Sequence, residues 1–368
     1  MWTLTKNKNW QELLQFGWVK DMRGVPQSPI HHAEGDVAIH TQMVLEALVN
    51  LADFKTLDKQ AQESLWVAAL MHDIEKRSTT VVDENGKIVS PGHAKKGAQT
   101  TRKILYRDFA TPFFIREQIV GLVRYHGLPI WVFEKPDPVK ALIQASLETD
   151  TQLLALLAKA DVLGRTCGDA EDLLYKIELF TELAKEYDCW GKPKQFYSDL
   201  SKFQYFYKEG RHPDFESFDD TKTSMILLSG IAGSGKDFYI SKNYPAHPVV
   251  SLDDMRRKAK IRYGDTKGNG QIIQEAKETA RQYLRNGTAF IWNATNITRQ
   301  MRGQMIDLAE PYQPMTKIIY LEVGYEKLLA QNKNRDFDIP GNAVERMIEK
   351  LEVPKIWEAP IVEYVVEY

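Results

Sequence analysis

A short glycine-rich segment constrains the fold of this chain of 368 residues more than any other feature. Residues 225–240 read MILLSGIAGSGKDFYI, so the glycines follow an apolar run that predicts a strand and precede a pattern that predicts a helix. Glycine lets the backbone turn its N–H groups toward a phosphate, and the N-terminus of the following helix adds partial positive charge. The segment therefore predicts a nucleoside triphosphate (NTP) site made by Gly230, Ile231, Ala232, Gly233, Ser234, Gly235 and Lys236, with the lysine on the β- and γ-phosphate oxygens.

The pattern of apolar residues divides the chain into two domains. As far as about Tyr207 it is helical almost throughout, with apolar residues three and four apart. Residues 211–223 are polar and acidic, and beyond them short apolar runs alternate with helical segments, as in a parallel sheet built from strand-helix-strand units. We expect an all-α domain over residues 1–210, a linker over 211–223 and an α/β domain over 224–368.

The composition fits a folded protein in a reducing compartment. Hydrophobic residues make up 43% of the chain and charged residues 27%. Cys167 and Cys189 form no C-x-x-C pair, and no apolar run is long enough to span a bilayer, so we expect a cytoplasmic protein that does not bind membranes. The formal net charge of −2 argues against coating nucleic acid along its length, but it permits local binding of a strand end.

Histidine and aspartate residues of the first domain lie beside the apolar stripes or at the ends of predicted helices. Residues 65–75 (LWVAALMHDIE) predict an amphipathic helix that ends in an adjacent His-Asp pair. Imidazole together with carboxylate suits divalent iron, manganese, cobalt or nickel, and a carboxylate between two histidine sets can bridge two ions. The candidate ligands are His40, His72, Asp73, His93, His126 and Asp161.

These residues, in this order, resemble the HD phosphohydrolase superfamily over roughly residues 30 to 170. The resemblance implies that His40, His72, Asp73 and Asp161 hold a first metal ion, and that His93 and His126 hold a second one bridged by Asp73. It also implies that Lys76 contacts the scissile phosphate, while the ions lower the pKa of water toward ~7 and neutralise phosphoryl charge. His31 and His32 match no ligand position and are expected to be loop residues. Other basic residues, Arg165 among them, could steer a phosphate but are expected on solvated helix faces.

A second strand of the α/β domain runs into PVVSLDDMRRK, which places Asp253 and Asp254 at its carboxyl end, where substrates bind in open α/β sheets. The sequence here resembles the phage-type polynucleotide kinases. That resemblance implies Asp253 as the general base for a 5′-hydroxyl group and Arg256 as the clamp for the acceptor phosphate. Asp254 is expected to support the site or to cap the following helix. Asp237 stands where such loops usually carry a Ser or Thr ligand of Mg²⁺, so we expect its carboxylate to bind the ion directly or through water.

Two later segments resemble the same kinase family. In the first, Arg299 and Arg302 are expected either to bind the acceptor or to lie on a solvent face; the other residues that match are Asn293, Thr295 and Asn296. The second, residues 332–354, resembles the helical lid of the family, with a helix from about residue 342. The resemblance implies that Arg335 of the lid contacts the NTP and stabilises charge on the transferred phosphoryl group, a role worth ~3–5 orders of magnitude in rate.

An HD phosphohydrolase ahead of such a kinase resembles the bacterial bifunctional polynucleotide kinase and 2′,3′-phosphatase enzymes (HD-Pnk) over nearly the whole chain. The resemblance implies ATP or GTP with Mg²⁺ in the kinase domain, and one or two ions of Mn²⁺, Co²⁺, Ni²⁺ or Fe²⁺ in the HD domain. RNA or DNA strand ends would be the substrates, and an RNA ligase would act downstream. One alternative is a nucleotide salvage or signalling enzyme that phosphorylates a small metabolite. Another is a nucleotide sensor that gates the HD domain.

Overall fold

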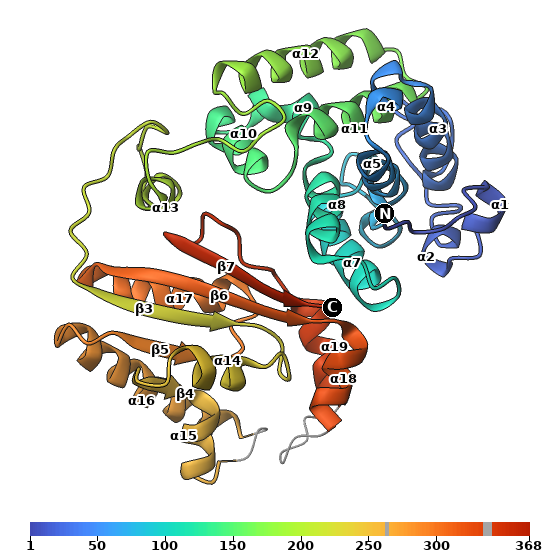
Figure 1. The fold of residues 1–368 in the computed structure, drawn as a ribbon. Coiled ribbons are helices and arrows are strands. Elements are labelled where there is room, and N and C mark those ends of the chain that lie inside the picture. Colours follow the sequence, from blue (N-terminus) through green and yellow to red (C-terminus); the bar gives the residue numbers. More distant parts are fainter. Residues whose placement is uncertain (262–264, 334–340) are drawn as a thin grey trace. The chain divides into compact units, whose positions relative to one another are not determined.

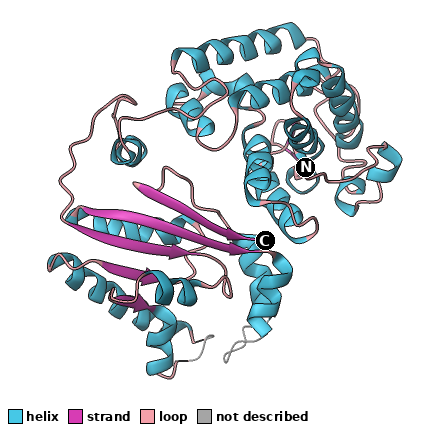
Figure 2. Cartoon of the chain, viewed as in Figure 1, coloured by secondary structure: helices cyan, strands magenta, loops and turns pink. Residues whose placement is uncertain are grey.

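The computed structural model describes residues 1–261, 265–333 and 341–368 of the chain. The chain forms two compact units, Met1–Gln195 and Phe196–Tyr368 (Figure 1). The first is helical apart from a small hairpin, whereas the second holds a parallel sheet (Figure 2). Within the described residues, we find no helix with the length and apolar character that crossing a membrane requires.

The first unit is built mainly from long helices. These are α3 (Val37–Asn50), α5 (Lys59–Met71), α7 (His93–Arg107), α8 (Phe113–Tyr125), α10 (Pro138–Ser146), α11 (Thr151–Leu163) and α12 (Ala170–Glu186). Shorter helical elements are α1 (Trp10–Leu13), α2 (Gly17–Lys20), α4 (Ala52–Thr56), α6 (Lys76–Thr79), α9 (Leu128–Trp131) and the 3₁₀ turn η1 (Val132–Glu134). Strands β1 (Val81–Val82) and β2 (Ile88–Val89) pair antiparallel and form a small hairpin.

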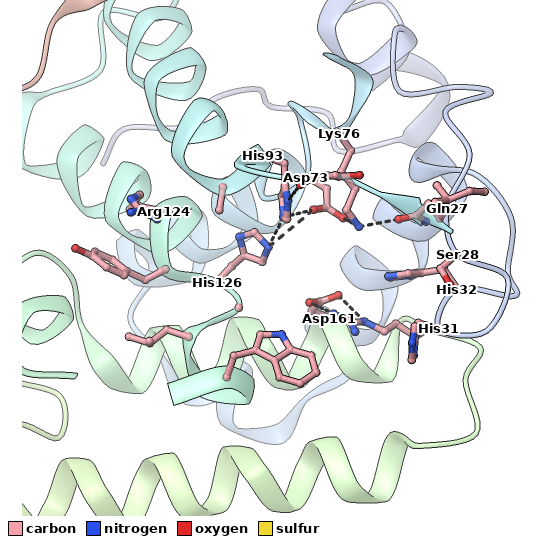
Figure 3. Close-up of a pocket in the computed structure, with 18 of the residues that line it drawn as sticks. Gln27, Ser28, His31, His32, Asp73, Lys76, His93, Arg124, His126 and Asp161 are labelled. Atoms are coloured by element: carbon pink, nitrogen blue, oxygen red, sulfur yellow. Dashed lines mark hydrogen bonds and ion pairs between the residues drawn. The ribbon is translucent and has the colours of Figure 1, made fainter. Parts of the chain in front are cut away.

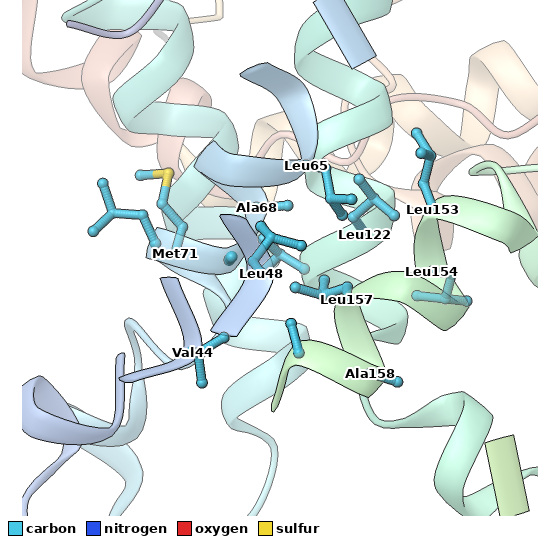
Figure 4. Packing of buried hydrophobic residues seen from close by; sticks show 14 of the residues in the cluster. Val44, Leu48, Leu65, Ala68, Met71, Leu122, Leu153, Leu154, Leu157 and Ala158 are labelled. Atoms are coloured by element: carbon cyan, nitrogen blue, oxygen red, sulfur yellow. The ribbon is translucent and has the colours of Figure 1, made fainter. Parts of the chain in front are cut away.

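The apolar core of this unit fixes the helices that carry the candidate ligands. Side chains of α3, α5, α8 and α11 pack together in it, and Figure 4 shows Val44, Leu48, Leu65, Ala68, Leu122, Leu154 and Leu157 among them. Close contact between α3 and the end of α11 requires Gly164, because a Cβ there would lie 2.6 Å from the backbone nitrogen of Val44. Since each buried Leu contributes about 1.5–3 kcal/mol, this core holds the ligand-bearing backbone rigidly.

The second unit is a five-stranded sheet in the order β4-β5-β3-β6-β7, and every described pairing in it is parallel. Its strands are β3 (Thr223–Ser229), β4 (Val249–Ser251), β5 (Phe290–Asn293), β6 (Pro314–Val323) and β7 (Ile361–Glu367). Its helical elements are α13 (Asp199–Tyr207), α14 (Lys236–Asn243), α15 (Leu252–Lys258), α16 (Thr266–Arg285), α17 (Arg299–Ala309), η2 (Glu310–Tyr312), α18 (Tyr325–Lys333) and α19 (Gly341–Lys350).

Alternation along β3 gives this sheet two apolar faces. Met225 and Leu227 belong to one buried cluster, whereas Ile226 and Leu228 belong to another. Because the strands are parallel, their carboxyl ends meet at one edge of the sheet. The glycine-rich loop follows β3 at that edge.

The compact units divide at Gln195 and Phe196, earlier than residue 210, where we expected the first domain to end. Helix α13 accounts for the difference. Phe203 is buried in an apolar cluster of the second unit, and the hydroxyl of Tyr207 donates to Asp307 of α17 at 3.0 Å. Helical periodicity cannot show which core an amphipathic helix joins, because it reports only that one face is apolar.

Candidate functional site

The first unit gathers all six candidate ligands into one group, which we call the histidine–aspartate cluster: His40, His72, Asp73, His93, His126 and Asp161. All of them are buried except His93, which is half-buried. Each comes from a different helix or helix end, apart from the adjacent His72 and Asp73. Figure 3 shows Asp73, His93 and His126 facing one another across the pocket, with Asp161 below them. The sequence thus located a set of residues that the fold brings together.

The atoms of this cluster lie at separations that suit metal coordination. Nε2 of His40 is 3.0 Å from Oδ1 of Asp161, and Nε2 of His72 is 3.3 Å from Oδ2 of Asp73. On the other side of Asp73, its Oδ1 lies 3.4 Å from Nε2 of His93 and 3.8 Å from Nε2 of His126. Metal–ligand bonds of about 2.0–2.2 Å place neighbouring ligand atoms at roughly these spacings. Asp73 therefore lies between two groups of potential ligands.

Backbone hydrogen bonds orient the histidines so that Nε2 is presented to the cluster. Nδ1 of His72 bonds the carbonyl of Ala69 at 2.7 Å, and Nδ1 of His126 bonds the carbonyl of Val123 at 2.9 Å. Nδ1 of His93 bonds the carbonyl of Ser90 at 2.8 Å. A carbonyl partner on the far nitrogen fixes the ring and the tautomer, which is the usual arrangement behind a histidine that ligates a metal.

Several buried polar atoms of the cluster have ion-pair neighbours but no hydrogen bond of good geometry among the described residues: Nε2 of His40, Nε2 of His72 and Oδ1 of Asp73. A bound cation would be a further partner for these atoms, since a buried polar group left unsatisfied costs about 1–3 kcal/mol. A mixed nitrogen and oxygen donor set suits divalent transition metals. These residues therefore fit one or two such ions, which would lower the pKa of a bound water and neutralise phosphoryl charge.

Charged neighbours keep the carboxylates of the cluster ionised. Burial alone would raise the pKa of Asp73, but Lys76 and His72 outweigh it and hold that pKa well below its usual range. Arg165 and His40 do the same for the buried Asp161. Burial, together with His72 and His93, lowers the pKa of His126 to about 3. His126 is accordingly neutral at physiological pH, as a metal ligand must be.

Two basic residues line the pocket beside the cluster. Nζ of Lys76 lies 2.7 Å from Oδ2 of Asp73 and donates to Oε1 of Gln27 at 2.8 Å (Figure 3). Lys76 is the residue for which the resemblance to the HD phosphohydrolases implied a contact with the scissile phosphate. Arg165 differs from the expectation of a solvated helix face, because it pairs with Asp161 and its side chain is only 13% exposed. Both cations are placed to meet an anionic substrate.

His32 and Glu34 are part of the site although the sequence assigned them no role. We expected His32 to be a loop residue outside the ligand set; it does lie in a loop, but it lines the pocket. Oε1 of Glu34 lies 2.9 Å from Nδ1 of His32 and 2.9 Å from Nδ1 of His40. Although burial raises the pKa of Glu34, bonds led by the one to His40 lower it to about 2, so this carboxylate is ionised beside His40, a candidate ligand.

Replacing Glu34 with glutamine is expected to weaken metal binding by about 10- to 100-fold, because the amide loses the charge that orients and polarises His40. The measurement is a titration of the metal-free protein with Mn²⁺ or Co²⁺. Glu46→Gln is the matched control, since Glu46 lies on α3, is exposed and accepts a hydrogen bond from Gln42. Equal affinities for the two variants would contradict the assignment.

The second unit carries the predicted phosphate loop between β3 and α14. Gly230, Gly233 and Gly235 have φ values of +153°, +88° and +90°, which only glycine adopts without strain. A Cβ at Gly230 would lie 2.5 Å from the backbone oxygen of Leu321, so the space there also demands glycine. Nζ of Lys236 donates to the carbonyls of Gly230 and Ile231 at 2.9 and 3.0 Å. The lysine is thus held at the loop, as a phosphate-binding lysine should be.

One cavity of about 180 Å³ joins this loop to the ends of β4 and β5. It is lined by Lys236 and Asp237 from the loop side and by Asp253 and Asn293 from the other strands. Oδ1 of Asp237 accepts a hydrogen bond of 2.7 Å from Asn293. Residues of the predicted phosphate loop and the predicted general base Asp253 therefore line one cavity, whereas the predicted acceptor-binding arginines Arg256, Arg299 and Arg302 are not among the described residues that line it.

Helix α15 places the predicted acceptor residues. Ser251, rather than Asp254, caps this helix by accepting from the backbone N–H of Asp254 at 3.2 Å. Asp253 pairs with Arg256, whose Nε donates to Asn269 at 2.7 Å. Arg299 is exposed and lies over the Trp357 ring at 4.4 Å. Arg335, the predicted lid arginine, lies outside the described residues, although helix α19 is present where the lid helix was predicted.

Arg302 does not bind an acceptor, which corrects the prediction. Its side chain is fully buried and pairs with Glu358, with Nε 2.7 Å from Oε2. It also donates to the carbonyls of Asn296 and Glu352 at 3.0 and 2.8 Å. Through these contacts the guanidinium holds the segment after β5 against residues 352–358, which precede β7. The sequence signal was ambiguous, because periodicity does not distinguish a buried cation from one on a binding face.

Replacing Arg302 with methionine is expected to lower the free energy of unfolding by about 3–5 kcal/mol, since Glu358 would remain buried and unpaired. Chemical denaturation, monitored by circular dichroism, measures this loss. The double variant Arg302→Met, Glu358→Gln should recover much of it by removing the stranded charge. A loss below about 1 kcal/mol in the single variant would show that the pair is not structural.

The comparisons with known proteins agree with this division of the chain. Residues 37–165 match the HD domain family, and residues 225–354 match a family described as AAA domain. The chain thus has an N-terminal HD domain and a C-terminal P-loop domain with a parallel sheet, which confirms the predicted fold class.

Among individual proteins, the multifunctional CCA protein of Halorhodospira halophila is 33% identical over 103 residues, which are 28% of this chain and 22% of that protein. The multifunctional CCA protein of Thioalkalivibrio sulfidiphilus is 33% identical over 159 residues, 41% of this chain and 35% of that protein. This chain therefore spans well under half the length of these relatives. A sugar kinase structure from Janibacter sp. HTCC2649 aligns at 15% identity with a TM-score of 0.30, covering 39% of this chain and 85% of that one.

Proposed function

We propose that this chain is a bifunctional enzyme that heals nucleic-acid strand ends, similar to the HD-Pnk enzymes. The P-loop domain would phosphorylate a 5′-hydroxyl end, and the HD domain would remove a 2′,3′-cyclic, 2′- or 3′-phosphate. The observation that carries the proposal is the single cavity lined by both Lys236 and Asp253. A nucleotide sensor needs only a phosphate-binding residue such as Lys236, whereas a kinase also needs a residue such as Asp253 that faces the acceptor beside the NTP phosphates.

In the kinase reaction, the acceptor oxygen attacks the γ-phosphorus while the bond to the β–γ bridging oxygen breaks. Asp253 would take the proton of the 5′-hydroxyl group, and Arg256 would bind the neighbouring phosphate. Lys236 would hold the β- and γ-phosphates of ATP or GTP, and Asp237 would bind Mg²⁺ directly or through water. Arg335 is proposed to contact the γ-phosphoryl group. Positioning and electrostatics would supply most of the rate enhancement.

In the hydrolytic reaction, a water oxygen attacks phosphorus, one bond to a ribose oxygen breaks, and that oxygen takes a proton from the attacking water. A 2′- or 3′-phosphate needs this step once, whereas a 2′,3′-cyclic phosphate needs it twice. The histidine–aspartate cluster would hold one or two ions of Mn²⁺, Co²⁺, Ni²⁺ or Fe²⁺. Lys76 lines the same pocket and would bind a phosphoryl oxygen. Together the two reactions would leave a 5′-phosphate and a free 3′-hydroxyl, the ends that an RNA ligase joins. The name of the relatives, multifunctional CCA protein, is consistent with several activities on one chain.

The decisive experiment is end analysis of a short labelled RNA with a 5′-hydroxyl and a 2′,3′-cyclic phosphate. The RNA is incubated with NTP, Mg²⁺ and each transition metal in turn, and both ends are scored separately. We expect both ends to be converted, the 3′ end only with a transition metal. Turnover of mononucleotides with no change at either RNA end would instead favour the salvage or signalling enzyme.

A further inference from the structure

The pocket of the HD domain is larger than a phosphate requires. It encloses about 660 Å³ and extends from the histidine–aspartate cluster to a second wall formed by α8, α9 and α10. That wall is largely apolar, with Tyr125, Leu128, Trp131 and Ala141 facing the cavity. The proposed hydrolytic reaction uses none of these side chains, so the wall needs a separate explanation.

Trp131 is the exposed aromatic residue of this wall. It ends α9, and 39% of it is exposed even though it lines the pocket. Nζ of Lys176 lies 4.3 Å from the centre of its ring and also contacts Oε1 of Glu134 at 3.3 Å. Lys176 is not among the described residues that line the pocket. The indole is therefore held by a cation outside the cavity while it presents apolar surface within it.

The neighbouring residues give the wall a rigid frame and a positive rim. The hydroxyl of Tyr125 donates to Glu148 at 2.8 Å and accepts from Gln144 at 3.0 Å, so this ring cannot rotate freely. Arg124 and Lys135 are exposed and line the same pocket. Figure 3 shows Arg124 on the far side of His126 from Asp73. An occupant of this wall would thus meet a flat apolar surface with cations near its edge.

We infer that this wall is a nucleobase subsite, in which Trp131 stacks on the base of the nucleotide whose phosphate lies at the histidine–aspartate cluster. The inference rests on the proposed function and names the substrate class of the same pocket. A base is planar and apolar on its faces, so stacking on an indole is favourable and tolerant of sequence. Arg124 and Lys135 would then lie near the backbone phosphates of the strand. A sugar phosphate without a base would leave uncovered the apolar surface that the indole presents to the cavity.

The test compares two short RNA strands that both end in a 2′,3′-cyclic phosphate, one with a normal terminal base and one with an abasic terminal ribose. Wild-type protein is compared with Trp131→Ala, Trp131→Phe and the matched control Phe133→Ala. Phe133 is 51% exposed and lies two positions further along the chain, outside the pocket lining. Both KM and kcat for phosphate removal are measured, and thermal unfolding checks that each variant is folded.

We expect Trp131→Ala to raise the KM for the base-bearing strand by roughly tenfold with little change in kcat, the size expected for a lost stacking contact. The KM of the abasic strand divided by the KM of the base-bearing strand should be smaller in Trp131→Ala than in the wild type. Trp131→Phe and Phe133→Ala should keep the wild-type ratio. An unchanged ratio in Trp131→Ala would overturn the subsite but leave the hydrolytic function standing. Failure of the wild-type protein to convert either strand would instead overturn the proposed function itself, and the subsite with it.

Discussion

Replacing Asp73 with asparagine is expected to lower phosphate removal from RNA ends by at least about 10³-fold. The reason is the position of its carboxylate, which lies against His72 through Oδ2 and against His93 and His126 through Oδ1. Asparagine keeps the shape of the side chain but removes the negative charge that lies between the two groups of candidate ligands. The protein should bind less transition metal, which metal analysis after dialysis measures alongside the rate of phosphate release.

Asp108→Asn is the matched control for this substitution. Asp108 belongs to the same unit, is exposed and pairs with Arg107, and neither residue is among the pocket lining, so replacing Asp108 should change neither metal content nor rate. Phosphorylation of the 5′ end by Asp73→Asn should also equal that of the wild type, because the kinase residues belong to the other compact unit. Full metal content together with a rate within tenfold of wild type would show that Asp73 is not a bridging ligand.

The sequence predicted the parts of the site that follow from periodicity and from local motifs. His40, His126 and Asp161 lie beside apolar stripes, and the stripe must face the core, so the direction of each side chain could be inferred before the structure. The glycine loop was equally predictable, since its backbone requirements select glycine at defined positions. Both inferences depend only on residues that are close together in the chain.

The remaining features depend on contacts between distant segments or on loops, for which the sequence gives no periodic signal. His32 and Glu34 precede α3 in an irregular segment, and Glu34 bonds the backbone N–H of Thr166 as well as contacting His40. Arg302 is buried because Glu358 lies beside it in the fold. Trp131 could equally have been a core residue of α9. In each case tertiary packing decides the role, and a single sequence does not report it.

The substitution expected to have the largest effect in the second domain is Asp253→Asn, which should lower the rate of 5′ phosphorylation by about 10²- to 10⁴-fold. Asparagine cannot accept the proton of the 5′-hydroxyl group, and a general base contributes an effect of this size. Binding of NTP should change little, because we expect Lys236 and the loop, not Asp253, to hold the phosphates. Single-turnover transfer from labelled ATP gives the rate, and a fluorescent nucleotide gives the dissociation constant.

Asp254→Asn provides a close control, since both aspartates lie in the first turn of α15 and each pairs with an arginine three residues later. Of these two aspartates, only Asp253 lines the cavity that contains Lys236. Comparing the two substitutions should therefore show whether a loss of rate comes from lost proton transfer or from the loss of a negative charge on the helix. If Asp254→Asn slowed transfer as much as Asp253→Asn, the effect would come from the charge of the helix end and Asp253 would not be the base. If neither slowed it, the acceptor would lie elsewhere along the carboxyl edge of the sheet. A large loss confined to Asp253→Asn, with NTP binding retained, would make the P-loop domain a kinase rather than a sensor.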